Sequence, residues 1–173
     1  MILGYIVGGL LVLILVPVVI YLITSLFDTV IRIEIVRNPV IRWIVIIILL
    51  ITGLIYGIWS VIIQNIIGEG GPVEIGKIEI SPKTKNLIVS GPYKYTRNPM
   101  LFGTFLIYLA FALFINSVTA VIFVVAILTF MLSVVVKMEE KRLLEDFGIQ
   151  FEKYQKRVSR FIPWVHKKMS SFP

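Results

Sequence analysis

Two short stretches hold most of the side chains in this sequence that are able to do chemistry. The first, GPYKYTRNPMLFG, runs from Gly91 to Gly103 and places two tyrosines, a lysine, an arginine and an Asn-Pro pair at the start of a long apolar run. The second is the pair Glu139 and Glu140, which follows a later apolar run. Guanidinium, amide, aromatic and carboxylate groups together can bind a polar molecule that carries both charges. The sequence therefore predicts a site for a polar cofactor at a membrane surface.

The composition places the chain in a membrane. Of its 173 residues 58% are hydrophobic, whereas a soluble domain contains about 45–50% apolar residues. The chain has no cysteine and a single histidine, His166, so we expect neither disulfides, nor a cysteine nucleophile, nor a bound metal. The net charge of +7 suits anionic lipid headgroups. We do not expect nucleic acid binding, because the basic residues flank apolar runs instead of forming a soluble basic face.

Four apolar stretches have about the length that a membrane-spanning helix needs, which is roughly 20 residues. The last two are separated only by Asn116 and Ser117, so we expect them to form a tight antiparallel hairpin. The sequence thus predicts an all-α, polytopic membrane helical bundle with about four transmembrane helices, a fifth being possible. The predicted spans are Ile2–Phe27, Trp43–Ile67, Met100–Ile115 and Val118–Val136.

The distribution of Lys and Arg predicts the orientation of this bundle. The loop 28–42 contains three of these residues, the segment 68–98 contains five and the tail 137–173 contains nine. Basic residues in short loops favour the cytoplasmic side of a membrane. With four spans, we therefore expect both termini, the segment 68–98 and the active site to be cytoplasmic.

Two smaller patterns concern helix packing and the connector between the second and third spans. Gly53 and Gly57 are four residues apart in the second span, a spacing that lets helix backbones approach closely. In the connector, GEGGPVEIGKIEISP alternates apolar and polar residues around Gly76 and Lys77. This alternation predicts a small hairpin or an extended edge.

The fourth span should continue as a helix beyond the membrane. No helix breaker occurs between Val136 and Gly148, and a glycine is common directly after a helix C-terminus, so we expect helix to about Phe147. The tail that follows alternates apolar residues with lysines and arginines. Either it lies on the headgroups as a basic amphipathic helix, or it folds back over a site.

The two glutamates at the end of the fourth span should differ in environment. At 100° per residue, Glu140 shares the apolar face of the helix with Val136, Leu143 and Leu144, while Glu139 lies at the edge of the charged face. A carboxylate on the apolar face at the membrane boundary is costly to bury alone. It is therefore either a functional group or a structural partner of a Lys or Arg in the tail.

The two chemical stretches together resemble a known family. KNLIVSGPYKYTRNPMLFG, a helical hairpin and then EEKRLLEDFGIQFEKYQKRVSRFIP resemble the GPYxxxRHPxY and EExxLxxxFGxxYxxYxxxVxRFIP segments of the isoprenylcysteine carboxyl methyltransferase and phospholipid methyltransferase superfamily. The resemblance covers residues 85–163, and we see no family signal in the first two spans. It implies an integral membrane enzyme that uses S-adenosylmethionine (SAM), with a cytoplasmic cofactor pocket and a tunnel for lipid from the bilayer.

The resemblance also implies site residues by position. The residues that would line the pocket or contact the cofactor are Leu87, Ile88, Tyr93, Asn98, Pro99, Met100, Leu101 and Glu139. Glu139 would meet the amino-acid end of the cofactor, whereas the helical wheel favours Glu140 as the inward carboxylate, so both are candidates for cofactor binding. Arg97 and Glu140 are the candidates for a catalytic role.

The sequence departs from the family pattern at three places. Asn98 replaces the histidine of RHP, and Leu101 replaces the tyrosine two residues after the proline. Isoprenylcysteine methyltransferases have an arginine one turn before the first glutamate, where this chain has Val135, with Lys137 as the nearest cation. These changes bear on the substrate more than on the cofactor.

These features predict a SAM-dependent methyltransferase that acts at the membrane on a lipid or lipidated substrate. We favour protein-S-isoprenylcysteine carboxyl O-methylation, because a carboxylate acceptor needs no general base, with phosphatidylethanolamine-type phospholipid N-methylation as the alternative. An NADPH-dependent sterol-type reductase and an inactive structural relative are more distant alternatives. The expected partners are membrane lipids and a lipid or prenylated substrate that enters from the bilayer.

We expect two parts in the chain. Residues 1–67 form an N-terminal transmembrane hairpin, and residues 68–173 form the catalytic methyltransferase core. The core comprises a cytoplasmic connector at 68–98, a helical hairpin at 99–147 and a C-terminal tail at 148–173.

Overall fold

The computed structural model describes residues 11–68, 74–75, 78–79 and 86–164. Five helices make up this part of the chain, and one of them contains a π-helical segment in its middle. They are α2 (Val16–Asp28, after the π-helical η1, Leu11–Leu15), α3 (Pro39–Ile67), α4 (Pro99–Ile115), the continuous helix α5–η3–α6 (Val118–Phe130, Met131–Val135, Val136–Phe147) and α7 (Ile149–Gln155). The short 3-10 helix η2 (Gly91–Lys94) precedes α4.

The predicted connector hairpin is confirmed by two short strands, β1 (Glu74–Ile75) and β2 (Ile78–Glu79), which pair antiparallel. The residues between them, Gly76 and Lys77, lie outside the described part of the chain.

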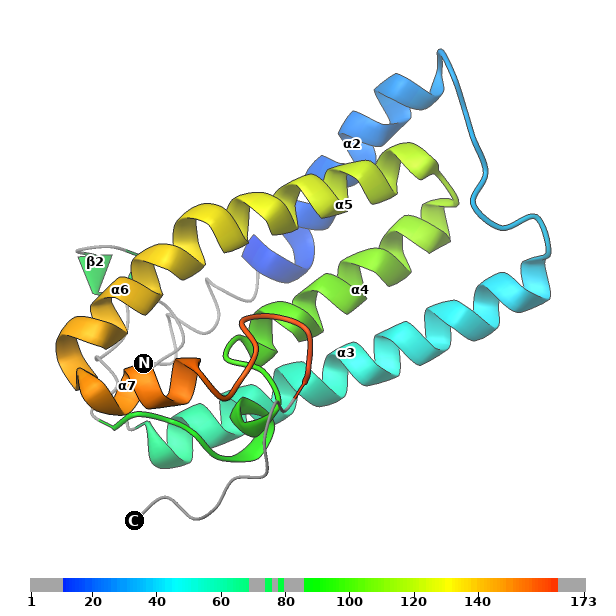
Figure 1. Cartoon of the computed structure of the whole chain (residues 1–173). Coiled ribbons are helices and arrows are strands. Elements are labelled where there is room, and N and C mark those ends of the chain that lie inside the picture. Colours follow the sequence, from blue (N-terminus) through cyan, green and yellow to red (C-terminus); the bar gives the residue numbers. More distant parts are fainter. Residues whose placement is uncertain (1–10, 69–73, 76–77, 80–85, 165–173) are drawn as a thin grey trace.

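The helices form a bundle in which α3, α4 and the continuous helix α5–α6 run alongside one another (Figure 1). Helix α2 packs on α5 and α4, and the buried residues at this contact form an apolar core. This core consists of Ile20, Tyr108, Ala112, Ala120 and Val124. The all-helical prediction is therefore confirmed for the described residues.

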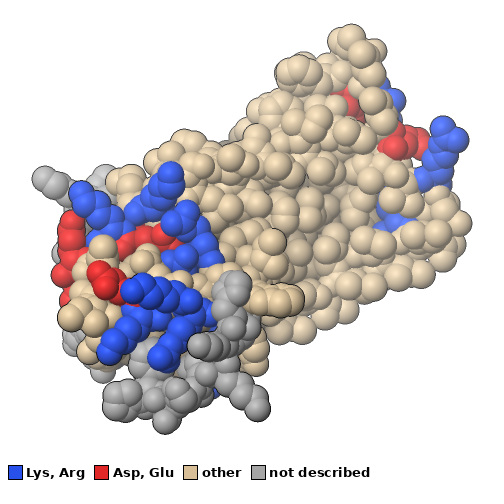
Figure 2. All heavy atoms as spheres, in the orientation of Figure 1, with Lys and Arg blue, Asp and Glu red and all other residues tan. Residues whose placement is uncertain are grey.

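Two of the four predicted spans lie in helices that are long and apolar enough to cross a membrane, Pro39–Ile67 and Val118–Phe147. Only 17% and 11% of their most apolar windows are buried, so most of this apolar surface faces outward, where lipid can cover it. The other two predicted spans correspond to shorter apolar helices, Leu13–Asp28 and Pro99–Ile115, in the described residues. Charged side chains gather at the two ends of the face shown in Figure 2, with Lys and Arg concentrated at the α6–α7 end.

The long helix ends where the sequence predicts. It runs to Phe147, and Gly148 follows with φ +50, a conformation that favours glycine. The π-helical segment Met131–Val135 inside it was not predicted. Such a segment holds one extra residue per turn and shifts the side chains before it relative to those after it. The residues compared on the helical wheel, Val136 to Leu144, all lie after it in regular α-helix. Leu144, which the wheel placed on the inward face, is exposed, and that prediction was wrong.

The predicted hairpin between α4 and α5 is confirmed, and side chains anchor it. Asn116 takes the left-handed conformation, and its Oδ1 accepts hydrogen bonds from the backbone amides of Ile35 and Val36. The Ser117 hydroxyl donates to Asp28 Oδ1 at 2.8 Å. The loop between α2 and α3 is thus tied to the α4–α5 turn at the end of the bundle opposite α7 (Figure 1).

Helices α3 and α4 touch backbone to backbone. A Cβ atom added to Gly103 would lie 2.7 Å from the carbonyl oxygen of Gly53, and one added to Gly53 would lie 2.8 Å from the carbonyl oxygen of Gly103. Gly57 is different, because a Cβ atom there would meet nothing within 4 Å. Of the glycine pair that the sequence singled out, Gly53 is the member at which an added side chain would clash.

This difference gives a matched pair of variants. Gly53→Ala should lower the thermal unfolding temperature of the detergent-purified protein by several degrees, because neither backbone can move away without separating the helices. Gly57→Ala should leave it unchanged or raise it slightly, since alanine favours a helix over glycine by up to about 1 kcal/mol. Equal behaviour of the two variants would show that the α3–α4 contact is looser than described.

Candidate functional site

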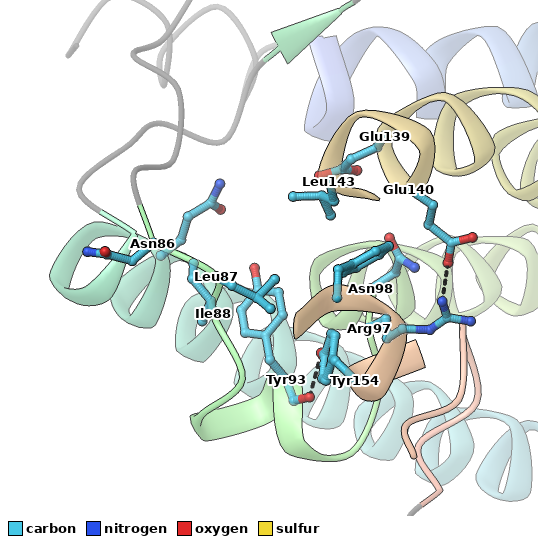
Figure 3. Close-up of a pocket in the computed structure, with 12 residues that line it drawn as sticks. Asn86, Leu87, Ile88, Tyr93, Arg97, Asn98, Glu139, Glu140, Leu143 and Tyr154 are labelled. Atoms are coloured by element: carbon cyan, nitrogen blue, oxygen red, sulfur yellow. Dashed lines mark hydrogen bonds and ion pairs between the residues drawn. The ribbon is translucent and has the colours of Figure 1, made fainter. Parts of the chain in front are cut away.

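The segment before α4 and the tail are interlocked. The backbone amide of Arg97 donates to the carbonyl of Ser159 at 2.9 Å, and the amide of Trp164 donates to the carbonyl of Tyr95 at 2.8 Å. The Tyr154 hydroxyl donates to the carbonyl of Tyr93 at 2.7 Å (Figure 3). Of the two arrangements considered for the tail, the described part, up to residue 164, folds back onto the first chemical stretch.

Apolar packing holds the tail in this position. Phe151, Tyr154 and Val158 are each no more than 3% exposed and form one cluster. Partly buried residues from the segment 86–98 and from α6 pack against this cluster: Leu87, Val89, Leu143 and Phe147. Phe151, Tyr154 and Val158 therefore face protein and not headgroups, whereas Ile162 and Trp164 are exposed.

A buried carboxylate joins three segments at this end of the bundle. Glu140 Oε1 lies 2.8 Å from Arg97 Nη1, and Glu140 Oε2 lies 2.6 Å from Arg160 Nη2 (Figure 3 shows the first of these pairs). Glu140 is 7% exposed, which agrees with its predicted place on the inward face. Of the two roles considered for Glu140, the structure shows the structural tie to a cation of the tail.

The guanidinium of Arg97 is the more buried of the two cations. Its side chain is 12% exposed, against 41% for Arg160. Burial lowers the pKa of Arg97, and the Glu140 carboxylate opposes that change. Arg97 Nε is buried and has no hydrogen-bond partner in the described residues. This group is therefore a hydrogen-bond donor that nothing in the described part of the chain accepts.

A small cavity of about 60 Å³ lies between the segment 86–98, α6 and α7, and we call it the polar cavity because most of its lining residues carry a polar or charged group. Leu87, Ile88 and Tyr93 form one wall, and Glu139 and Leu143 face them from α6 (Figure 3). The remaining lining residues are Gln64, Asn86, Arg97, Asn98, Glu140, Phe151 and Tyr154.

Burial raises the pKa values of the two tyrosines in this cavity. For Tyr93 the negative charge of Glu139 adds to the effect of burial. For Tyr154 the nearby Tyr93 adds to it, and the cation Arg97 opposes it. Both phenols are protonated at neutral pH, and that of Tyr154 donates to the carbonyl of Tyr93.

A second cavity of about 310 Å³ adjoins the first and is mainly apolar. Residues of α2, α4, α5, η3 and α6 line it, among them Phe105, Val124, Leu128, Met131 and Val135. Five residues line both cavities: Gln64, Tyr93, Arg97, Asn98 and Glu139. The polar cavity thus meets the apolar cavity at these five side chains, which we call the junction.

Glu139 is the carboxylate at this junction. It is exposed and lines both cavities, and no Lys or Arg of the described residues lies within ion-pair distance of it. Glu140, in contrast, is paired with two guanidiniums. The two glutamates therefore differ as the sequence indicates, but the unpaired carboxylate is Glu139.

The structure divides the residues that were predicted to contact a cofactor between the two cavities. Leu87 and Ile88 line only the polar cavity, while Pro99, Met100 and Leu101 line only the apolar one. Tyr93, Asn98 and Glu139 stand between them, with Arg97.

Asn98 is the N-cap residue of α4, but its side chain makes no capping hydrogen bond. Its Nδ2 instead donates to the carbonyl of Arg160 at 2.8 Å. The amide that replaces the family histidine thus ties α4 to the tail. The carbonyl of Arg160 thus takes the place of the helix amides as the partner of this side chain.

Sequence reasoning missed several residues of the site. Gln64 was not considered, although an amide inside an apolar span is a signal for a functional position. Tyr154 and Arg160 lie in the second family-like segment, but their partners are far away in sequence and no spacing rule identifies them.

One family of known proteins matches most of this chain. A family model described as phospholipid methyltransferase matches residues 41–150. The chain belongs to the phospholipid methyltransferase family, within the superfamily that its motifs resemble. Enzymes of this family use SAM as methyl donor, so the chain is a SAM-dependent membrane methyltransferase. The match includes α3, where we saw no family signal in the sequence. No curated protein and no solved structure gave a significant match.

The paired Glu140 gives a stability prediction. Glu140→Gln removes the only carboxylate that faces the buried Arg97 in the described residues, so it should destabilise the protein by about 3–5 kcal/mol and expose the tail to proteases. Arg160→Gln should cost less, since Arg160 is partly exposed and Arg97 keeps its partner. Thermal unfolding and limited proteolysis in detergent measure both effects.

The control is Glu145→Gln on the same helix. Glu145 forms an exposed pair with Lys141, and exposed pairs contribute at most about 1 kcal/mol. A Glu140→Gln variant as stable as this control would contradict the structural role assigned to Glu140.

Proposed function

We propose that this protein is a phospholipid N-methyltransferase that transfers a methyl group from SAM to a phosphatidylethanolamine-type amine. The observation that carries the proposal is the junction at which one polar and one apolar cavity share five residues. A polar methyl donor and a lipid acceptor must meet at one point, and this junction is such a point. The family match supports the phospholipid alternative and not the isoprenylcysteine reaction that the sequence favoured.

The residues at the polar cavity fit the donor chemically. SAM carries an ammonium and a carboxylate, and it supplies a methyl group on a sulfonium. The unpaired Glu139 carboxylate would hold the ammonium, and the unpartnered Nε of Arg97 would donate to the carboxylate. The protonated Tyr93 phenol and the apolar Leu87 and Ile88 would bind the remainder. A cavity of about 60 Å³ is smaller than the whole donor, so we infer that binding widens it.

The apolar cavity favours an amine acceptor over a carboxylate. Val135, in the place of the arginine of isoprenylcysteine methyltransferases, lines this cavity and offers no positive charge. Arg97, the one cation among the described residues of its lining, is already paired with Glu140 and would also bind the donor carboxylate, so it is not free for a second carboxylate. An amine has no such conflict. Each methylation replaces one N–H bond of the amine by an N–CH₃ bond and releases one proton to water.

We also propose a topology with four spans, in which α2 and α4 cross the membrane together with the two longer helices. The excess of Lys and Arg in 68–98 and in the tail supports a cytoplasmic position for both termini and the site. In this proposal residues 1–67 form the N-terminal hairpin, and residues 68–173 form the catalytic core.

Ligand binding and turnover test the function separately. We expect S-adenosylhomocysteine to stabilise the detergent-purified protein in a thermal shift assay, and NADPH to have no effect. Glu139→Gln should abolish the shift or weaken binding at least tenfold, because one charged hydrogen bond contributes about 1.5–3 kcal/mol. With labelled SAM, phosphatidylethanolamine in mixed micelles should become methylated.

The control variant is Glu145→Gln, which should bind S-adenosylhomocysteine as the unmodified protein does. Methylation of a prenylcysteine but not of phosphatidylethanolamine would overturn the proposed acceptor. It would not contradict the proposed binding site for SAM. A shift with NADPH alone would overturn both.

A further inference from the structure

Gln64 is a polar residue on the inward face of an apolar helix. Along α3, Gly53, Gly57, Ser60 and Gln64 follow one another at intervals of four, three and four residues, which places them on one face. Gly53 meets α4 directly, and Ser60 is completely buried, so this face points into the bundle. Its neighbour Asn65 is exposed, and the Asn65 side chain donates to the carbonyl of Val61 in its own helix.

Gln64 is also the residue of α3 that lies at the junction. Among the lining residues of both cavities it is the one that comes from α3. The other four junction residues belong to the two family-like segments. Gln64 therefore reaches the junction from a different helix than the groups that would hold the donor.

Three of the other junction side chains are already engaged by charge or by a hydrogen bond. Arg97 pairs with Glu140, and Asn98 donates to the carbonyl of Arg160. Glu139 carries a charge that, in the proposed function, holds the donor ammonium. The carboxamide of Gln64 is uncharged and never takes up a proton, and its oxygen has two lone pairs, so it can accept a hydrogen bond in addition to other contacts.

We propose that the Gln64 carboxamide oxygen accepts a hydrogen bond from an N–H of the phospholipid amine and thereby orients the nitrogen lone pair. This inference rests on the proposed function and deepens it. It makes Gln64 a positioning residue whose effect depends on the number of N–H bonds in the acceptor amine. As the neutral nucleophile, phosphatidylethanolamine has two N–H bonds, the monomethyl lipid has one and the dimethyl lipid has none. Gln64 then serves the first two methylations and not the third.

The test compares Gln64→Met with the unmodified enzyme on all three lipids in mixed micelles. Methionine keeps the length and unbranched shape of glutamine but has no carboxamide. We expect kcat/KM to fall about tenfold for phosphatidylethanolamine and for the monomethyl lipid, as for one lost hydrogen bond, and less than twofold for the dimethyl lipid. If the unmodified enzyme does not methylate one of the lipids, we compare the inhibition constant of that lipid for the two proteins. The change in this constant on Gln64→Met should be largest for phosphatidylethanolamine and smallest for the dimethyl lipid.

Two controls separate positioning from structure. Asn65→Leu removes an amide from the adjacent, exposed position and should leave all three values unchanged. The thermal shift with S-adenosylhomocysteine should be the same in Gln64→Met and in the unmodified protein. A general loss of structure would instead lower the three activities by one common factor.

An equal loss on all three lipids, or no loss on any, overturns the role of Gln64. If the unmodified enzyme binds S-adenosylhomocysteine but neither methylates nor is inhibited by any of the three lipids, the phospholipid assignment itself fails. The two failures are therefore distinguishable.

Discussion

Two guanidiniums that share one buried carboxylate hold the functional end of this protein together. Arg97 comes from the segment before α4, Glu140 from α6 and Arg160 from the tail, so three segments that are distant in sequence meet at one carboxylate. Replacing a buried ion pair by apolar residues is often neutral for stability, but removing one partner is costly. The cluster therefore specifies one arrangement of the three segments more than it adds to the free energy of folding.

The neighbouring carboxylate lies in a different environment. Successive residues of a helix point about 100° apart, so Glu139 does not share the two cations of Glu140 and lies at the junction of the cavities. Two glutamates in succession thus differ in their surroundings within one turn of helix. The tail completes the site by bringing Tyr154 against Tyr93 and by accepting the hydrogen bond of Asn98.

Much of the fold was predictable, because it depends on local patterns. Hydrophobic run length indicated the helices, Asn116-Ser117 indicated the α4–α5 turn, and Gly148 indicated the end of α6. The inward position of Glu140 also followed from helical periodicity. The partners of Glu140 and Asn98 did not, since both depend on where the tail docks. Gln64 was missed because it lies outside the family-like segments, although the family match extends over it.

The backbone contact between Gly53 and Gly103 limits where the protein can move. Side chains can change rotamer to absorb a displacement, but two carbonyl oxygens in van der Waals contact with the facing helix cannot. Helices α3 and α4 thus act as a rigid half of the molecule, which carries Gln64 and the start of the apolar cavity. The other half, made of α6, α7 and the tail, is joined to the segment before α4 and to α4 through hydrogen bonds, the Arg97–Glu140 ion pair and the packing of Phe161 on Phe102 and Phe105. Residues of α6 line both cavities, so a displacement of the second half would change the shape of both while the α3–α4 contact stays fixed.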